Sequence, residues 1–272
     1  MPSLAYTEPK HHGGASSSKV LFCLLFVPSI LAGLVFFLLS IVLGYPFLLV
    51  LYLFKREVLT SALTPASQES IRRNPAFRDA ALLARVWQSP VGQLYLHGPL
   101  EYQLREGYCA PTTLRNVLHS IPSLPAETVP AARSGPSTAV QYKTKIDAIG
   151  ATSSTVVYGS DGFSAFVEAI KLANDPQYRV AVNFLHAALF GMGGPKWFAP
   201  VLLGAVMGGH FSNVIGYLED VDMVLVFDVN QDFGPYLVDT HRLFQAVRAS
   251  DIQSGKSRAL VVSQLTGPAT QV

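Results

Sequence analysis

The feature that most constrains this chain is a stretch of 35 residues, 20–54, without a single charged side chain. About 20 apolar residues are enough for a helix to cross the hydrocarbon core of a bilayer. A secretory signal peptide has a shorter apolar core that ends at a small-residue cleavage site, so the stretch favours a membrane segment. Both a single long span and a re-entrant hairpin fit its length, and Gly33, Gly44 and Pro46 would permit a kink.

Basic residues flank this stretch on both sides. Lys10 and Lys19 precede it, and Lys55 and Arg56 follow it. Lysine and arginine are enriched on the cytoplasmic side of membrane segments. The excess after residue 54 therefore favours a cytosolic catalytic domain. The later arginines fit either anionic lipid headgroups or a solvated amphipathic linker. They are Arg72, Arg73, Arg78 and Arg85.

Composition limits the remaining functions. The residues after the apolar stretch, about 210, are enough for one domain with a core. A net charge of +2 gives no support to nucleic-acid binding. The two cysteines, one of them inside the apolar stretch, do not make a disulfide framework. A lone thiol outside the membrane fits a reducing compartment, and no Cys/His group has metal-ligand spacing.

We divide the chain into five parts. Residues 1–19 are polar and are expected to be disordered. Residues 20–54 form the membrane segment or hairpin, and residues 55–94 form a juxtamembrane linker and helix. Residues 95–265 form the catalytic domain, and residues 266–272 are a tail.

Within the catalytic domain the pattern predicts helices first and an antiparallel sheet later, which is an α+β arrangement. Apolar side chains at Leu114, Val117, Leu118 and Ile121 recur at helical spacing. Further helices are predicted at 77–87, 161–173 and 238–247, and a loop at 121–138. Strands are predicted at 179–185, 211–217, 223–229 and 258–263.

Cys109, the only cysteine outside the apolar stretch, stands where the helical pattern begins. Pro111 suits the first turn of such a helix, where no amide hydrogen bond is lost. A helix N-terminus favours a thiolate and lowers the pKa of the cysteine, and the thiolate is the nucleophile. Gln103 could aim its side-chain amide, with the N–H of Cys109, at a developing oxyanion. The alternative is an ordinary buried cysteine.

His210 and Asp228 complete a candidate triad. A hairpin centred on Glu219 would place these two residues directly opposite each other, with Cβ atoms roughly 5 Å apart. The carboxylate would then fix the orientation of the imidazole, and a carboxylate in an apolar strand needs a partner. The alternative is that Asp228 caps a turn while His210 packs against Phe211.

These residues, in this order and spacing, resemble the phytochelatin synthase family, the papain-like γ-glutamylcysteine dipeptidyl transpeptidases. The resemblance covers residues 95–265. It rests on Gln103 with the Tyr108-Cys109 pair, on Val-Asn-Phe at 182–184 and on Gly-Gly-His-Phe-Ser at 208–212, and it continues through 215–217, 222–229 and 254–258.

The resemblance implies a papain-like cysteine protease fold, with the cysteine on the helical part and the histidine and aspartate on the sheet. It implies that Cys109 attacks the Cys–Gly amide of glutathione, that His210 acts as general base and then acid, and that Asp228 orients it. Gln103 would bind the oxyanion. The γ-Glu-Cys acyl group would then pass to another glutathione, as in phytochelatin synthesis and heavy-metal detoxification, or to water.

The resemblance also implies which residues contact the substrate: Arg258, Asn183, Gly209 and Tyr108. A guanidinium at Arg258 can bind a carboxylate through two hydrogen bonds, although a solvated basic loop with Lys256 is the alternative. The expected partners are glutathione, its metal complexes and the lipid bilayer, without nucleic acid, and a homodimer is left open. No tightly bound cofactor or protein metal site is expected, because cadmium or zinc would enter as a glutathione thiolate or as an activator.

The sequence departs from the family pattern around both halves of the site. Ala110 stands where glycine is usual, and Arg105-Glu106-Gly107 precede the cysteine where an acidic residue and proline are usual. Residues 230–235 lack the arginine and the Tyr-Pro-Pro stretch of the family. These changes bear more on transfer to a second substrate than on formation of the acyl-enzyme.

An apolar insertion, residues 190–207, precedes His210. It could form a buried structural loop, cover the active site or enter the lipid surface. Two other functions also fit the chain. One is a papain-like peptidase of the bacteriocin-processing type, which shares the Gln-then-Cys pattern and the His–Asp hairpin. The other is a non-catalytic membrane adaptor that keeps the fold.

Overall fold

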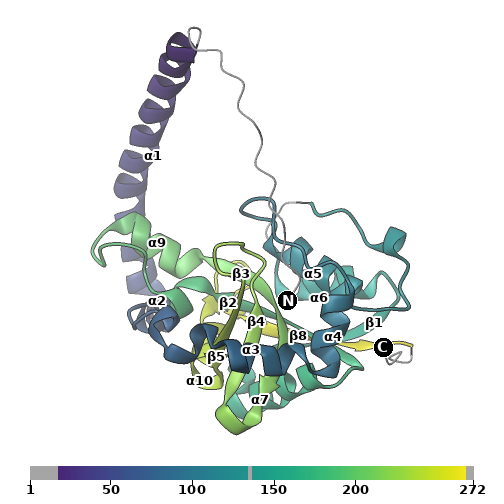
Figure 1. Ribbon diagram of the computed structural model, residues 1–272. Helices are drawn as coiled ribbons and strands as arrows, with labels where there is room; N and C mark the ends of the chain where they lie inside the picture. The colour runs from purple at the N-terminus through teal and green to yellow at the C-terminus, as the bar shows by residue number, and fades with distance from the viewer. Residues whose placement is uncertain (1–17, 134–136, 268–272) are drawn as a thin grey trace.

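The computed structural model describes residues 18–133 and 137–267 (Figure 1). Two predicted segments, the disordered residues 1–19 and the tail at 266–272, therefore lie almost wholly outside the described residues. One continuous helix, α1 (Ser18–Phe54), projects from the rest of the chain. Its part Ile30–Phe54 is long and apolar enough to cross a membrane. Because this helix is unbroken, the re-entrant hairpin is wrong.

The catalytic part is built on a six-stranded sheet in which every neighbouring pair is antiparallel, so the predicted α+β class is confirmed. The strand order is β1-β8-β2-β3-β4-β5. The strands are β1 (Thr152–Tyr158), β2 (Tyr178–Leu185), β3 (Gly209–Leu218), β4 (Met223–Phe227), β5 (Pro235–Asp239) and β8 (Ala259–Leu265), and a short separate pair joins β6 (Ser250–Asp251) to β7 (Lys256–Ser257).

Helices cover both faces of this sheet, which explains why its central strands are almost continuously apolar. On β2, Val180, Val182 and Phe184 pack into the larger core, and Ala181 packs into the core on the other face. The larger core is closed by α2 (Arg56–Ala66), α7 (Phe163–Lys171), α8 (His186–Phe190), α9 (Ala199–Met207) and α10 (Thr240–Arg248). The opposite face is covered by α3 (Ala80–Trp87), α4 (Pro90–His97), α5 (Cys109–His119) and α6 (Ala139–Asp147).

Short 3₁₀ helices connect these elements: η1 (Ile71–Arg73), η2 (Pro75–Arg78), η3 (Ala126–Thr128), η4 (Gly159–Asp161), η5 (Leu172–Asn174) and η6 (Glu219–Val221). The helix predicted at 238–247 begins two residues later than expected, at Thr240, because Val238 pairs with Val224 as part of β5. The strand β1 has no counterpart among the predicted strands.

Residues 55–94 are packed into the domain rather than forming a linker. Ala62, Phe77 and Val91 in this segment are all buried. The domain boundary drawn at residue 95 falls inside α4. The apolar insertion at 190–207 is likewise not a buried loop, since it contains α9, which lies against the lower part of α1 (Figure 1).

Candidate active site

Helix α5 begins at Cys109, as the sequence predicts, and its first turn faces β3. The four apolar residues that predicted this helix are all buried: Leu114, Val117, Leu118 and Ile121. They hold the helix on the sheet, while Cys109 at its N-terminus is only half-buried and carries a free thiol. The unpaired N–H groups of the first turn stabilise a thiolate at this position.

His210 lies on β3 and contacts Asp228 directly. The His210 Nε2 and Asp228 Oδ1 atoms are 2.6 Å apart, and the carboxylate is completely buried. Asp228 Oδ1 also accepts a hydrogen bond of 2.8 Å from the backbone N–H of Asn230. Asp228 therefore caps a turn and also binds His210, and it does both through the same carboxylate oxygen.

The register of β3 with β4 from which the sequence analysis predicted this pair is wrong. Asn213 pairs with Phe227, which places Asp228 opposite residue 212 and not opposite His210. A bulge between Val214 and Gly216 and the left-handed conformation of Asp222 (φ 51°) shift the pairing from a hairpin centred on Glu219. The two side chains still meet because diagonal neighbours on one face of a sheet lie within reach of long side chains.

Cys109 and His210 lie close enough to shift each other's pKa. Burial by itself raises the pKa of the thiol, but the hydrogen bond and charge of His210 bring it below its ordinary value, with help from the backbone N–H groups of Phe211 and Ala110. Burial lowers the pKa of His210, but Asp228 and then Cys109 outweigh it and raise the pKa to about 10. The favoured state is a thiolate–imidazolium pair.

Two buried asparagines fix α5 to β3. Asn213 Nδ2 donates to the carbonyl oxygen of Thr113 at 3.0 Å, and Asn116 Nδ2 donates to Asn213 Oδ1 at 3.2 Å. Asn116 Oδ1 also accepts from the backbone N–H of Glu101 at 2.8 Å. Because one element carries the cysteine and the other the histidine, this network sets the position of the thiol relative to the imidazole.

Gln103 lines the same cavity as Cys109 and His210. Its backbone N–H donates to the carbonyl oxygen of Val229 at 2.7 Å, which ties its loop to the residue after Asp228. Its side-chain Oε1 is buried and, among the described residues, has no hydrogen-bond partner. The structure therefore brings Gln103 to the nucleophile, as its predicted role requires.

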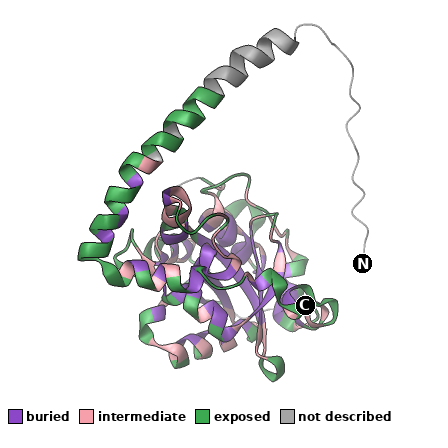
Figure 2. Cartoon of the chain, turned by 90° about the vertical axis from the view of Figure 1, so that its left-hand side faces the viewer, coloured by how far each residue is buried: buried purple, intermediate pink, exposed green. Residues whose placement is uncertain are grey.

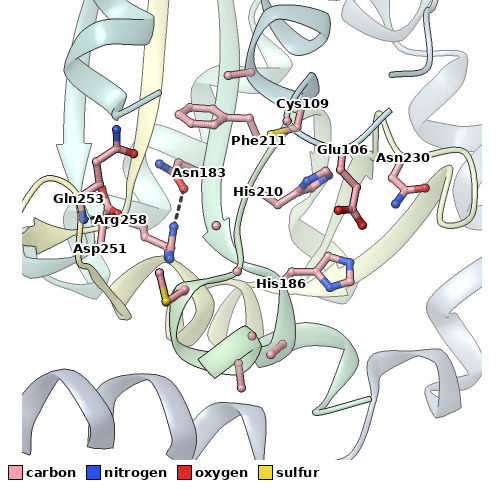
Figure 3. Close-up of a pocket in the computed structure, with 18 of the residues that line it drawn as sticks. Glu106, Cys109, Asn183, His186, His210, Phe211, Asn230, Asp251, Gln253 and Arg258 are labelled. Atoms are coloured by element: carbon pink, nitrogen blue, oxygen red, sulfur yellow. Dashed lines mark hydrogen bonds between the residues drawn. The ribbon is translucent and has the colours of Figure 1, made fainter. Parts of the chain in front are cut away.

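Three of the four predicted substrate contacts also line this cavity: Arg258, Asn183 and Gly209. Arg258 is buried, so the solvated-loop alternative is wrong. Its Nη1 donates to Asn183 Oδ1 at 3.2 Å (Figure 3). A Cβ atom at Gly209 would lie 2.3 Å from Arg258 Nη1, so glycine is needed for the guanidinium to lie against β3.

The fourth predicted contact, Tyr108, is not among the described residues that line the cavity. It occupies the N-cap position of α5, and its hydroxyl accepts a hydrogen bond of 3.1 Å from Arg105. A role in holding the loop before Cys109 therefore fits its position better than a substrate contact.

The cavity has a volume of about 1080 Å³ and includes polar residues that the sequence analysis did not select, among them His186, Glu106 and Asp251 (Figure 3). The ring of His186 lies 5.7 Å from the ring of His210 and stacks on Phe190 at 4.5 Å. Burial and the charge of His210 lower the pKa of His186 to about 4, so it is neutral at physiological pH. The one signal for His186 in the sequence was its position directly after a predicted strand.

The loop after Asp228 is held by two of the arginines that follow α1. Arg72 donates to the carbonyl oxygen of Asp232 at 3.4 Å and lies over the ring of Phe233, with its Cζ 4.6 Å from the centroid. Arg78 donates to the carbonyl oxygen of Phe233 at 2.6 Å. These arginines are part of the scaffold of the site.

Residues 141–260 match the family model of phytochelatin synthase. This part of the chain is similar to phytochelatin synthase. The matched segment contains His210, Asp228 and Arg258, and it begins after Gln103 and Cys109. This match, over less than half of the chain, supports the resemblance to phytochelatin synthases seen in the sequence. No curated protein matches the chain.

Among the described residues, no group of three or more His, Cys, Asp or Glu side chains could hold a metal ion. The catalytic and substrate-binding roles of the site residues stay predictions, because their placement shows what is near the thiol and not what reacts. The arrangement places a thiol, a histidine and a carboxylate together, which are the residue types that acyl transfer through a thioester uses.

Proposed function

We propose that this protein is a membrane-anchored thiol acyltransferase that cleaves the Cys–Gly amide of glutathione and passes the γ-Glu-Cys group to another glutathione or to water. The observation that carries this proposal is the contact of Cys109 with the His210–Asp228 pair in a chain that is similar to phytochelatin synthase over residues 141–260. A papain-like fold is part of the proposal, supported by a cysteine at a helix N-terminus facing a histidine and an aspartate on an antiparallel sheet.

In the first half-reaction, the Cys109 thiolate attacks the carbonyl carbon of the Cys–Gly amide. Negative charge then develops on the carbonyl oxygen, where the N–H of Cys109 and the amide of Gln103 stabilise it. The His210 imidazolium gives its proton to the nitrogen of the leaving glycine as the C–N bond breaks. A γ-Glu-Cys thioester on Cys109 and a neutral imidazole remain.

In the second half-reaction, His210 takes a proton from the incoming amine of a second glutathione, or from water, while that nucleophile attacks the thioester. The C–S bond breaks, and Cys109 leaves as the thiolate beside the imidazolium. Asp228 keeps the ring oriented through Nε2, which leaves Nδ1 for proton exchange with substrate and thiol. The cavity exceeds the roughly 300 Å³ of a small ligand pocket several-fold, which leaves room for an acceptor beside the donor.

Arg258 supports an anionic substrate. It is buried, burial lowers its pKa to about 10, and it is still charged at neutral pH. Among the described residues no carboxylate forms an ion pair with it, although the charges of Asp251 and Cys109 lie near enough to raise its pKa. A glutathione carboxylate could bind this guanidinium directly through two hydrogen bonds.

Metal and membrane belong to the same proposal. Cadmium or zinc would enter as a glutathione thiolate complex or act as an activator, without a tightly bound cofactor. The α1 helix would anchor the domain to the bilayer, with the catalytic domain on the cytosolic side, where glutathione is reduced. A homodimer is compatible with this arrangement, and nucleic acid is not a partner.

Mass spectrometry of the products tests the function. The full chain, purified in detergent, is incubated with glutathione, with and without cadmium or zinc. We expect free glycine and γ-Glu-Cys, with oligomers of γ-Glu-Cys ending in glycine if transfer dominates. Cys109→Ser should lower glycine release by at least about 10³-fold, because the nucleophile is lost, whereas Cys23→Ser should leave it unchanged.

Each product pattern has one meaning. Oligomers identify a synthase, and γ-Glu-Cys with glycine alone identifies a glutathione hydrolase on the same site. Substantial glycine release by Cys109→Ser would exclude the proposed nucleophile. No glycine release by the parent protein, with Cys109 rapidly alkylated, would exclude glutathione as the donor and favour a peptidase.

A further inference from the structure

The lower part of α1 packs on the domain by one face only. Gly44, Leu48 and Leu51 lie on that face and are buried. Most of the other side chains between Val42 and Phe54 are apolar and exposed, and Phe54 is 75% exposed. Figure 2 shows the exposed surface continuing along this part of the helix. An apolar surface of this extent is unusual on a protein in water, so the lipid-facing part of α1 extends to the end of the helix.

The apolar helix α9 lies directly against this part of α1 (Figure 1). The rings of Phe37 and Phe198 are 5.3 Å apart, and the hydroxyl of Tyr45 donates to the carbonyl oxygen of Trp197 at 2.8 Å. A Cβ atom at Gly44 would lie 3.0 Å from the Leu203 side chain, so glycine permits the close approach of the two helices. These contacts fall inside the apolar segment Ile30–Phe54.

The surface of the α9 region has the composition of a membrane interface. Helix α9 has no charged residue. Trp197, just before it, is 72% exposed, and Met207 at its end is exposed as well. Tryptophan is enriched where protein meets the lipid headgroups. Lys196, next to Trp197, adds a basic group that suits anionic headgroups.

We propose that residues 196–198 and helix α9 enter the bilayer alongside α1, so that the partner of this face is lipid. The described side chains of α1 are mostly apolar and exposed on both sides of its contact with α9, from Ile30 to Phe54. Because this exposed apolar surface continues past the contact to Phe54, whatever packs beside residues 37–45 lies at the level of the lipid. The proposal rests on the membrane anchoring proposed above and not on the glutathione chemistry.

This placement gives the active-site cavity a wall that borders lipid. Val201, Gly204, Ala205 and Met207 of α9 line the cavity that contains Cys109. The nucleophile therefore lies close beneath the membrane surface, and the shape of its cavity depends on a helix whose other side is in contact with α1 and lipid. With this placement, the apolar insertion would both cover the active site and enter the lipid surface, which the sequence analysis had offered as separate alternatives.

Fluorescence quenching by brominated lipid tests this contact. The chain has two tryptophans, so Trp87→Phe leaves Trp197 as the only tryptophan. This full-length variant is reconstituted into phosphatidylcholine vesicles with or without bromine on the acyl chains. We expect brominated lipid to reduce Trp197 fluorescence at least two-fold, while acrylamide in the water has little effect. The matched Trp197→Phe variant reports Trp87, which should not be quenched by brominated lipid.

Trp197 quenched by acrylamide and unaffected by brominated lipid would overturn the proposal. Gly44→Leu should change Trp197 quenching at least two-fold because it pushes α9 away from α1. Gly33→Leu, where nothing lies within 4 Å, should leave it unchanged. Extraction of the vesicles with carbonate separates the two membrane contacts. If the protein resists extraction but Trp197 is not quenched, α1 is in the membrane and the proposed contact of α9 with lipid is wrong. Quenching without glycine release would instead leave the membrane contact standing and remove the proposed chemistry.

Discussion

Cys109 and His210 form one ionisable unit, and their joint charge state decides the reactivity of the thiol. The lowered pKa of Cys109 means that the thiolate appears below the ordinary range of cysteine. The raised pKa of His210, about 10, means that the imidazolium persists through neutral pH and is lost only as the pH rises toward that value. The ion pair should therefore exist across the whole neutral range.

Alkylation by iodoacetamide measures this pair. In a Cys23→Ser background, we expect Cys109 to react rapidly at pH 6 and to gain little between pH 7 and 9. His210→Ala should move the midpoint of the rate profile upward by one unit or more, because burial of the thiol is then uncompensated. His97→Ala removes an exposed histidine and should have no effect. A profile that His210→Ala does not move would show that the thiol is not paired with this histidine.

Gly209 tests the role of Arg258 without changing any polar group. The methyl group of Gly209→Ala would collide with the guanidinium. We therefore expect the KM for glutathione to rise about ten-fold or more, with alkylation of Cys109 unchanged. Gly193→Ala adds the same methyl group to another cavity glycine, where nothing lies within 4 Å. Equal KM values for the two variants would remove Arg258 from substrate binding.

The junction of α5 with β3 carries the geometry of the site at the scale of elements. Asn213→Ala leaves the carbonyl oxygen of Thr113 and the amide of Asn116 without their buried partner. We expect a loss of about 1–3 kcal/mol in the free energy of unfolding, measured by urea denaturation in detergent. Ser212→Ala is the matched control on the same strand, because the buried Ser212 hydroxyl has no hydrogen-bond partner among the described residues. A loss as large for Ser212→Ala would argue against the hydrogen bonds as the cause.

What the sequence predicted at this scale depended on local pattern. The α5 helix was predictable because its buried residues recur at helical spacing. The register of β3 with β4 was not, because one bulge and one left-handed residue, Asp222, decide it. The strand β1 begins with polar residues and lies at the edge of the sheet, so it gave no apolar alternation. His186 had only its position directly after a predicted strand as a signal, and Glu106 had none, since only the tertiary fold brings them to the cavity.

At the scale of the whole molecule, helix α1 and the domain that follows it share one core. Leu48 and Leu51 of α1 belong to the same buried cluster as Leu59 and Phe77 of the domain. A fragment that starts after residue 54 would therefore expose part of this core. This sharing could not be predicted from the sequence, because a uniformly apolar helix does not reveal which of its faces packs on the domain.

Paired alanine substitutions test the shared core in the full chain. Leu48→Ala with Leu51→Ala should destabilise the catalytic domain by about 2 kcal/mol or more per site, seen as a lower unfolding temperature in detergent. Leu49→Ala with Leu53→Ala removes the same number of atoms from exposed positions of α1 and should leave that temperature unchanged. Equal unfolding temperatures for the two double variants would mean that α1 is only a tether. A lower temperature for the first pair alone would mean that the buried face of α1 is part of the folded domain.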